Sequence, residues 1–335
     1  MKGPNPFAAL EGGSDILSVR KDESRIFNGL LEATGAGQSS MILVKGGPGS
    51  GKSAMLSAFK EEAERNGMLS PYVKAERNED IRAVAGKLCQ DGALLAGTIA
   101  KEAPDGIIGL VRVLERMASK RHFGVIVFID DLDIMRKAEE HLPQIWRTLG
   151  KSKVSFVVSI TRGLKISLPE NAKLMELRPL DEHDANEMVE RALKKGPPKM
   201  GEECMNSIMT DTQGNPRLFR TACRFVYDKL RDNERVISKG HYLAYLPYIM
   251  SMLGREWFGR LYQEIPASEK AILAVLASSE DGMHVSDVAK RLKKPLGPTT
   301  ALMKRLLDTG QVVKLDRGKY RVFARLYARY AAQRG

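Results

Sequence analysis

The spacing of apolar residues changes twice along the chain, and these changes predict three structural regions. Over the first 180 residues, short uninterrupted apolar runs alternate with longer segments in which apolar residues recur every three or four positions. The runs are typical of strands buried on both faces, and the longer segments are typical of amphipathic helices. Strands are expected at 41–44, 71–74, 124–129, 154–160 and 175–177, and helices at 53–66, 80–89, 107–119 and 141–149. This alternation predicts an α/β fold with a parallel sheet and helices on both faces.

The second region shows helical spacing without intervening strands. Three helical patterns, at 181–193, 202–211 and 216–230, follow one another there. They predict a small all-α lid next to the sheet domain. We therefore divide the chain into an α/β domain, a lid with its linker and a C-terminal domain, at 1–180, 181–253 and 254–335.

The third region has helices first and strands afterwards. Its helical patterns lie at 269–276, 284–292 and 298–308. Two strand patterns follow, at 311–315 and 319–323, and the Asp-Arg-Gly sequence between them is a strong signal for a tight turn. Three helices followed by a hairpin predict a winged helix-turn-helix.

The segment between the first strand and the first helix reads GGPGSGKS and fits the pattern G-x-x-x-x-G-K-[ST]. In this context, glycines let consecutive backbone N–H groups converge on phosphate oxygens at the positive end of a helix. Lys52 is expected to reach the β- and γ-phosphates of ATP, and the Ser53 hydroxyl is expected to ligate Mg²⁺. A glycine-rich turn with a chance lysine is the alternative, and the flanking strand and helix weigh against it. The predicted nucleotide-binding residues are Gly46, Gly47, Pro48, Gly49, Ser50, Gly51, Lys52 and Ser53.

A second part of a nucleotide site follows the run at 124–129, which ends in the sequence DDLD. The end of a parallel strand places these carboxylates at the edge of the sheet where the glycine-rich loop also lies. Asp130 is expected to hold Mg²⁺, largely through water. Asp131 is expected to polarise the attacking water, and because aspartate is shorter than the glutamate of many ATPases, slow hydrolysis is expected. The alternative is a charged turn after a strand.

Polar residues after the next strand and at the start of a lid helix extend the predicted site. At Thr161 a hydroxyl is expected to position water, and at Arg162 a guanidinium is expected to sense the phosphate charge. Ser159 is the alternative polar sensor, and a loop-capping role is the alternative for Thr161. In the lid, Pro216 is expected to pack on adenine. Arg217 is expected either to contact the γ-phosphate or to point outward.

The net charge of +12 is concentrated towards the C-terminal end. Residues 254–335 hold sixteen Lys and Arg against eight Asp and Glu, so this segment carries +8. A basic winged helix suits the phosphates of double-stranded DNA, with a helix in the major groove and the hairpin on the backbone. A solvated basic surface is the alternative, and weak sequence preference is expected because the third helix has no Asn or Gln. The predicted DNA-facing residues are Thr299, Thr300, Lys304, Arg305, Lys314, Arg317 and Lys319.

Other features restrict the class of protein. No apolar run approaches the length of about 18 residues that a membrane span needs, so no membrane partner is expected. The three cysteines, Cys89, Cys204 and Cys223, are scattered and form no C-x-x-C pair. This spacing predicts a reducing compartment, the cytoplasm, and no structural zinc. The five histidines are isolated, so the metal expected is the Mg²⁺ that accompanies the nucleotide.

Taken in order, the motifs GGPGSGKS, FIDDLD, SITRG, LRPLDEHDA and GNPRLF resemble the archaeal ATPases of the STAND branch, close to the AAA+ origin-recognition initiator ATPases. Residues 5–7 and 19–23 are similar to the N-terminal adenine-side box of that family, although Val19 replaces the usual glycine. The resemblance extends over essentially the whole chain. It implies a P-loop domain, a helical lid and a C-terminal winged helix.

The resemblance implies a nucleotide-controlled switch, an ATPase of slow Mg²⁺-dependent turnover, and not a metabolic enzyme. Initiator relatives bind DNA through the winged helix, which favours duplex DNA as the partner. STAND relatives couple ATP binding to signalling or self-assembly, so a winged helix that docks a protein is the alternative. Arg147, Arg162 and Arg178 all qualify as an arginine finger, and ring assembly is therefore not predicted.

Overall fold

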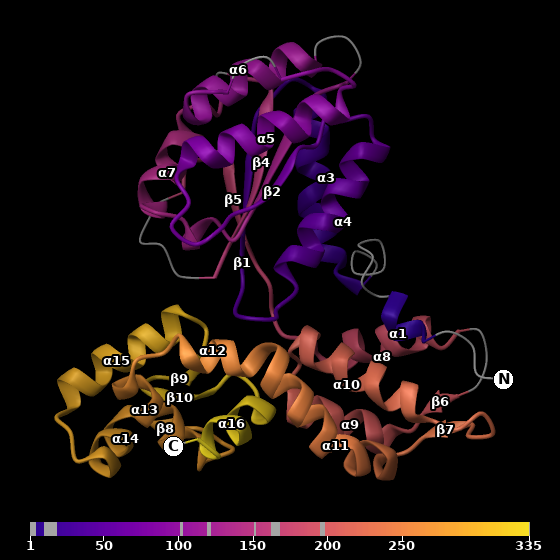
Figure 1. Cartoon of the computed structure of the whole chain (residues 1–335), viewed down its shortest axis with the longest axis vertical. Coiled ribbons are helices and arrows are strands. Elements are labelled where there is room, and N and C mark those ends of the chain that lie inside the picture. The colour runs from indigo at the N-terminus through magenta and orange to yellow at the C-terminus, as the bar shows by residue number, and fades with distance from the viewer. Residues whose placement is uncertain are drawn as a thin grey trace. The chain divides into compact units, whose positions relative to one another are not determined.

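The computed structural model describes residues 5–9, 19–100, 103–118, 122–150, 152–161, 168–194 and 198–334. The chain divides into two compact units, which are considered separately below (Figure 1). One unit combines Gly12–Gly46 with Gly51–Leu177, and we call it the sheet unit. The other combines Met1–Glu11, Gly47–Ser50 and Arg178–Gly335, and we call it the helical unit.

The sheet unit is built on five parallel strands in the order β2-β3-β4-β1-β5. Each strand overlaps an apolar run that predicts it, and β3 and β4 are buried along their whole length. Because β4 lies between β1 and β3, the carboxyl ends of these three strands are neighbours at one edge of the sheet. The strands are β1 Met41–Lys45, β2 Tyr72–Lys74, β3 Val125–Asp130, β4 Val154–Ile160 and β5 Ala172–Glu176.

Helices cover both faces of this sheet (Figure 1). On one face, α3 and α4 pack through Phe27 and Phe59, whose stacked rings lie 4.1 Å apart, against Ile126 and Phe128 of β3. On the other face, α5, α6 and α7 pack against the alternate strand positions, among them Val127. Both sets of strand positions are apolar because both faces are buried. The helices are α3 Lys21–Gly35, α4 Lys52–Arg65, α5 Ile81–Leu95, α6 Gly106–Ala118, α7 Ala138–Trp146 and the short 3-10 helix η1 Leu132–Ile134.

The helical unit begins with the predicted lid helices, which are followed by a helical stretch that the periodicity did not predict. The lid helices are α8 Glu182–Ala192, α9 Glu202–Thr212 and α10 Pro216–Lys229, and α1 Pro6–Ala9 packs on α10 through Phe7. Two short strands, β6 Lys199–Met200 and β7 Val236–Ile237, pair beside them. The unpredicted stretch consists of α11 Lys239–Leu253, the π-helix η2 Gly254–Phe258 and α12 Gly259–Gln263. Among the described residues, no helix has both the length and the apolar character required to cross a membrane.

The C-terminal part of the helical unit is the predicted winged helix-turn-helix. Three helices precede a hairpin, and a short strand before the second helix completes a three-stranded antiparallel sheet in the order β8-β10-β9. Neither this short strand nor the last helix was predicted. The elements are α13 Ala267–Ala277, β8 Met283–His284, α14 Val285–Leu292, α15 Leu296–Asp308, β9 Val312–Asp316, β10 Lys319–Val322 and α16 Arg325–Ala332.

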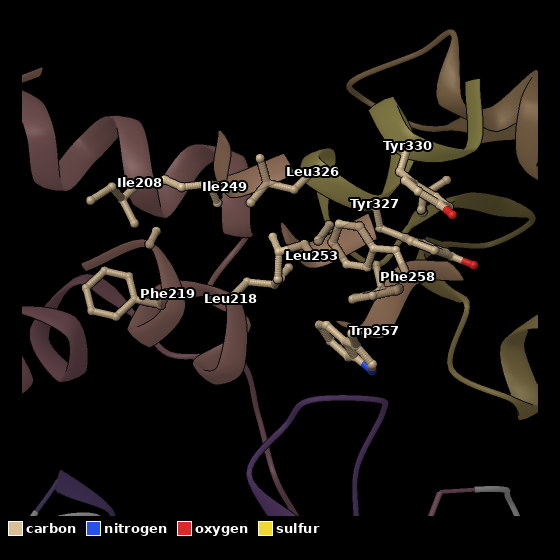
Figure 2. Close-up of a cluster of buried hydrophobic side chains, with 14 of the residues drawn as sticks. Ile208, Leu218, Phe219, Ile249, Leu253, Trp257, Phe258, Leu326, Tyr327 and Tyr330 are labelled. Carbon is tan, nitrogen blue, oxygen red and sulfur yellow. The ribbon is translucent and has the colours of Figure 1, made fainter. Parts of the chain in front are cut away.

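The lid and the winged helix share one hydrophobic core (Figure 2). Phe258 belongs to this core and is fully buried, with its ring centroid 5.1 Å from that of Tyr327 and 5.6 Å from that of Tyr330 on α16. Leu218 of the lid and Leu253 of α11 belong to the same cluster. The predicted boundary between residues 253 and 254 therefore falls at the step from α11 to η2, inside a continuous helical stretch.

Replacing Phe258 by alanine is expected to lower the free energy of unfolding of the helical unit by about 3–5 kcal/mol. The substitution removes a fully buried ring and leaves a cavity between the lid and α16. Leu243→Ala on α11 is the matched control, since this side chain is 49% exposed and its loss should change stability by less than about 0.5 kcal/mol. Urea unfolding of both variants measures the difference. Equal stabilities would mean that the shared core does not hold the two parts together.

Candidate functional site

The loop between β1 and α4 has the backbone geometry that phosphate binding requires. Gly49 and Gly51 adopt φ angles of +73° and +96°, a left-handed region that other residues rarely adopt. Nothing lies within 4 Å of the position that a Cβ of Gly51 would take. No side chain caps the start of α4 at this glycine, so the first N–H groups of the helix suit an anion. The Ser50 hydroxyl is buried and has no hydrogen-bond partner among the described residues, which also suits a phosphate oxygen.

Lys52 is buried at the first position of α4. It is 8% exposed, and its Nζ donates a hydrogen bond to the Gly46 carbonyl oxygen at 3.1 Å. Burial lowers the pKa of this ammonium, and the charges of Asp131, Asp133 and Asp130 partly oppose that shift. Because a buried cation is stabilised by nearby negative charge, this environment favours an anionic ligand at the loop.

Asp130 ends β3 and is fully buried, with hydrogen bonds to both carboxylate oxygens. The Ser159 hydroxyl donates to Asp130 Oδ1 at 2.5 Å, and the Tyr72 hydroxyl donates to Oδ2 at 3.2 Å. Ser159 also accepts a hydrogen bond of 2.8 Å from the backbone N–H of Asp131. Ser159 therefore ties the two aspartates to the neighbouring strand β4. The sequence predicts Ser159 only as an alternative polar sensor.

Asp131 follows Asp130 in a left-handed conformation, with a φ of +55°. This conformation is uncommon for a residue other than glycine and often marks a functional position. Burial and the adjacent charge of Asp130 raise the pKa of the Asp131 carboxyl, while Lys52 and Lys74 lower it. Lys74 Nζ lies 3.5 Å from Asp131 Oδ2 and 3.8 Å from Asp130 Oδ2. Two adjacent carboxylates supply oxygen ligands of the kind that suits Mg²⁺.

Thr161 directly follows β4, the strand that lies between β1 and β3. Its backbone N–H donates to Asp133 Oδ1 at 3.0 Å, so the third aspartate of the DDLD segment orders this strand end. Arg162 lies outside the described residues. Of the other two candidate arginine fingers, Arg147 is exposed after α7, and Arg178 forms ion pairs of 2.7 Å with Asp181 and Asp184 at the start of α8.

Residues 215–217 begin α10, and residues 47–50 of the glycine-rich loop belong to the same helical unit. Asn215 caps the helix by accepting a hydrogen bond from the Leu218 N–H, and its Nδ2 donates to the Pro48 carbonyl at 2.9 Å. The N–H of Arg217 donates to the Gly49 carbonyl at 3.2 Å. The Arg217 guanidinium lies 4.4 Å above the ring of Trp257, a cation–π contact that we did not predict. Pro216 occupies the first position of α10, where its missing N–H leaves no backbone hydrogen bond unmade.

Six of the seven predicted DNA-facing residues lie at least partly in solvent on the winged helix, and one does not. Thr299 is fully buried, and its hydroxyl donates to the Pro295 carbonyl at 2.9 Å. Helical spacing places Thr299 on the same face as the buried Met303 and Leu306. The expectation that Thr299 faces DNA is therefore wrong. The other residues are Thr300, Lys304, Arg305, Lys314, Arg317 and Lys319, of which Lys319 is partly buried.

Sequence reasoning missed two sets of side chains. Tyr72 and Lys74 reach the aspartates because β2 pairs with β3 in a register that sets Lys74 opposite Asp130. Strand pairing of this kind has no local signal in the sequence. The second set consists of exposed basic residues at the end of α14 and in the turn that follows, where the basic run itself was a visible signal. These residues are Lys290, Arg291, Lys293 and Lys294.

Comparison with solved structures shows that the fold extends over nearly the whole chain. The Walker-type ATPase paby2304 of Pyrococcus abyssi aligns with a TM-score of 0.69 and 16% identity, covering 93% of this chain and 95% of that one. Drosophila ORC bound to DNA aligns with a TM-score of 0.51 and 15% identity, covering 93% and 86%. The Aeropyrum pernix Orc1 protein in complex with DNA aligns with a TM-score of 0.49 and 17% identity, covering 94% and 92%. At these identities the likeness concerns the fold alone.

Comparison at the level of sequence gives a match over part of the chain. No curated protein sequence matches this chain. A family model described as the AAA ATPase domain matches residues 17–157, a range that includes the glycine-rich loop, Lys52 and both aspartates of the site described above. Over residues 17–157 the chain is therefore similar to the AAA ATPase domain.

Proposed function

We propose that this protein is a switch-type ATPase, which binds ATP with Mg²⁺ at the glycine-rich loop and hydrolyses it slowly. The observation that carries this proposal is the charge arrangement within the sheet unit. A buried ammonium, Lys52, stands at the start of α4, and its positive charge lowers the pKa of the Asp131 carboxyl, which follows β3. The Lys52 ammonium suits phosphates, and the carboxylates of Asp130 and Asp131 suit a divalent cation. Titration of ATP into wild type and into Lys52→Ala tests the proposal, because only wild type is expected to bind.

Ser53 and Asp130 are the residues that would hold Mg²⁺. When bound, Mg²⁺ would neutralise charge on the phosphates during transfer. Asp130 keeps its orientation through the hydrogen bonds from Ser159 and Tyr72. Such fixed orientation of a carboxylate lowers the reorganisation needed during reaction.

Asp131 is the residue proposed to orient the attacking water. Burial and Asp130 raise the pKa of its carboxyl, so its carboxylate is a stronger base than that of an exposed aspartate. Thr161 at the end of β4 is proposed to position the same water through its hydroxyl, with Arg162 as the phosphate-sensing group. Pro216 and Arg217 are proposed to complete the adenine and phosphate contacts from the lid. Slow turnover is expected for two reasons. The Asp131 side chain is short, and the arginine that would accelerate the transfer has to come from another copy or from a partner.

We also propose that the winged helix engages double-stranded DNA, mainly through phosphates. The segment 254–335 carries +8, and its exposed basic residues lie on α15, on the hairpin and in the turn after α14. Arg317 lies at the hairpin tip, where its backbone N–H donates a hydrogen bond of 2.6 Å to Asp316 Oδ1. The fold is also that of Drosophila ORC, whose solved structure is bound to DNA, although the likeness supports the fold and not the activity. Docking of a protein partner by this winged helix is the alternative.

Replacing Arg317 and Lys319 together with alanine is expected to weaken duplex binding about equally on all sequences. Each phosphate contact contributes about −0.9 to the slope of log K against log salt. The double variant should therefore bind with a slope shallower by up to about 2. Fluorescence anisotropy with two unrelated duplexes over a salt series measures both quantities.

The matched control for this experiment is Arg231→Ala combined with Lys239→Ala, exposed basic positions of the lid and of α11. This control should keep the salt slope of wild type. If wild type binds neither duplex at low salt, or if the Arg317 and Lys319 variant keeps the full slope, the winged helix is assigned to protein docking instead.

A further inference from the structure

A small cavity lies within the helical unit, between the end of α9 and the winged helix. It has a volume of about 50 Å³ and is lined by Gln213 after α9, by Glu280 after α13 and by Arg321, Arg325 and Arg329 from β10 and α16. None of these residues belongs to the proposed nucleotide site or to the proposed DNA surface. Three arginines around one small cavity are unusual, because their like charges repel unless each is paired.

Two of the three arginines have acidic partners. Arg325 Nη1 lies 2.8 Å from Glu280 Oε2, and the side chain of Glu280 is 65% exposed, so the pair lies at the mouth of the cavity. Arg329 forms hydrogen bonds of 3.2 and 2.8 Å from its two terminal nitrogens to the carboxylate of Asp211. Arg321 makes no ion pair and no side-chain hydrogen bond to any residue that the structure describes.

Three polar atoms around the cavity are buried without a hydrogen-bond partner in the described part of the chain. They are the Nε atoms of Arg321 and Arg325 and the Oε1 atom of Gln213. Burial lowers the pKa of Arg321, and the adjacent charge of Arg325 lowers it further. Buried donors without partners are costly, more so when they are charged. Glu280 and Asp211 pair with Arg325 and Arg329, so Arg321 brings to the cavity one positive charge that no carboxylate of the described residues pairs with.

We propose that this cavity binds a tetrahedral phosphate-type oxyanion, either inorganic phosphate or the phosphate group of a small molecule. The planar guanidinium groups of Arg321 and Arg325 present N–H donors in the geometry that suits phosphate oxygens. Gln213 Oε1 is an acceptor for the remaining hydroxyl of HPO₄²⁻, which sulfate lacks at neutral pH. The volume is a few times that needed for one water, so it accommodates a single oxyanion and excludes a nucleoside.

Calorimetric titration of the full chain with sodium phosphate at constant ionic strength tests this proposal. The parent protein carries Lys52→Ala, which removes phosphate binding at the glycine-rich loop. It is expected to bind phosphate saturably, and sulfate more weakly. Adding Arg321→Gln should weaken phosphate binding by at least about tenfold, because a charged hydrogen bond is lost. Arg291→Gln, a solvent-exposed arginine of the same winged helix that bonds Ser278, should leave phosphate affinity unchanged.

Three further measurements complete the test, and one of them uses the wild-type chain. Without phosphate, Arg321→Gln should unfold at the same temperature as its parent or higher, since an unpaired and partly buried charge is removed. Crystals of the wild-type chain soaked in tungstate, a heavy analogue of phosphate, should show a metal peak between Arg321 and Arg325. Titration with glycerol phosphate separates the two sources of the ligand: tighter binding than inorganic phosphate assigns a phosphate ester, and weaker binding assigns the free ion.

Three outcomes would overturn the proposal. The first is the absence of saturable phosphate binding by the parent together with an empty tungstate map. The second is equal phosphate affinity of the parent and of Arg321→Gln. The third is a loss of duplex binding in Arg321→Gln with no phosphate binding in the parent, which would assign these arginines to nucleic acid.

Discussion

Replacing Lys52 by alanine is expected to nearly abolish ATP binding while the protein remains folded. The ammonium is buried at the start of α4 and held at the loop by the Gly46 carbonyl. Backbone N–H groups alone cannot neutralise the charge of a triphosphate, and each hydrogen bond to a charged group contributes about 1.5–3 kcal/mol. Loss of contacts to two phosphates should therefore raise the Kd at least about 10²-fold. Calorimetry or a fluorescent ATP analogue measures this change.

Lys60→Ala is the matched control, because Lys60 lies on the same helix and pairs with Glu64. Its ATP affinity should equal that of wild type. Thermal unfolding should show that both variants are folded. Burial lowers the pKa of the Lys52 ammonium, so burying this charge is unfavourable, and its replacement by alanine removes that cost. Unchanged ATP affinity in a folded Lys52→Ala variant would contradict the nucleotide site.

The sheet unit could be predicted from the sequence because its strands are buried on both faces. Such strands appear as continuous apolar runs, and the runs at 124–129 and 154–160 match β3 and β4 to within one residue. The loop was predictable for another reason: its glycines, lysine and serine occupy fixed positions in a strand–loop–helix context. The edge strand β5 was predicted less well, since it spans Ala172–Glu176 and only its end lay in the expected range.

The helical stretch 239–263 could not be predicted from its periodicity. Only Tyr242, Ile249 and Leu253 of α11 are buried, whereas apolar residues occur all around the helix. Pro247 inside α11 is a further signal against a helix. Tertiary packing of this stretch in the core that the lid shares with the winged helix outweighs both signals.

The candidate site shows the same division between local and long-range information. Asp130 and Asp131 follow from a local motif, but Tyr72 and Lys74 reach them through the pairing of β2 with β3. The burial of Thr299 was within reach of the sequence, because its helical spacing to Met303 and Leu306 is visible there. Residues whose placement depends on strand register are the ones that sequence reasoning missed.

Replacing Asp131 by asparagine is expected to leave ATP binding largely intact and to reduce turnover by about 10²–10⁴-fold, the usual contribution of a general base. Asparagine keeps the size of the side chain and the backbone N–H bond to Ser159, but it is not basic. Asp130→Asn should instead weaken Mg²⁺-dependent ATP binding, because Asp130 is proposed to hold the metal and the amide lacks the charge. Phosphate release and ATP affinity, each measured over a range of MgCl₂ concentrations, separate the two effects.

Asp105→Asn is the control for general loss of negative charge, since Asp105 pairs with Arg82 in solvent. It should bind and hydrolyse ATP as wild type does. The different effects expected for Asp130 and Asp131 are the test of the assignment, because the two residues are adjacent and Ser159 bonds the carboxylate of one and the backbone N–H of the other. General damage to this strand end would change binding and turnover together in both variants. Turnover equal to that of wild type in both would show that the DDLD segment does not act in hydrolysis.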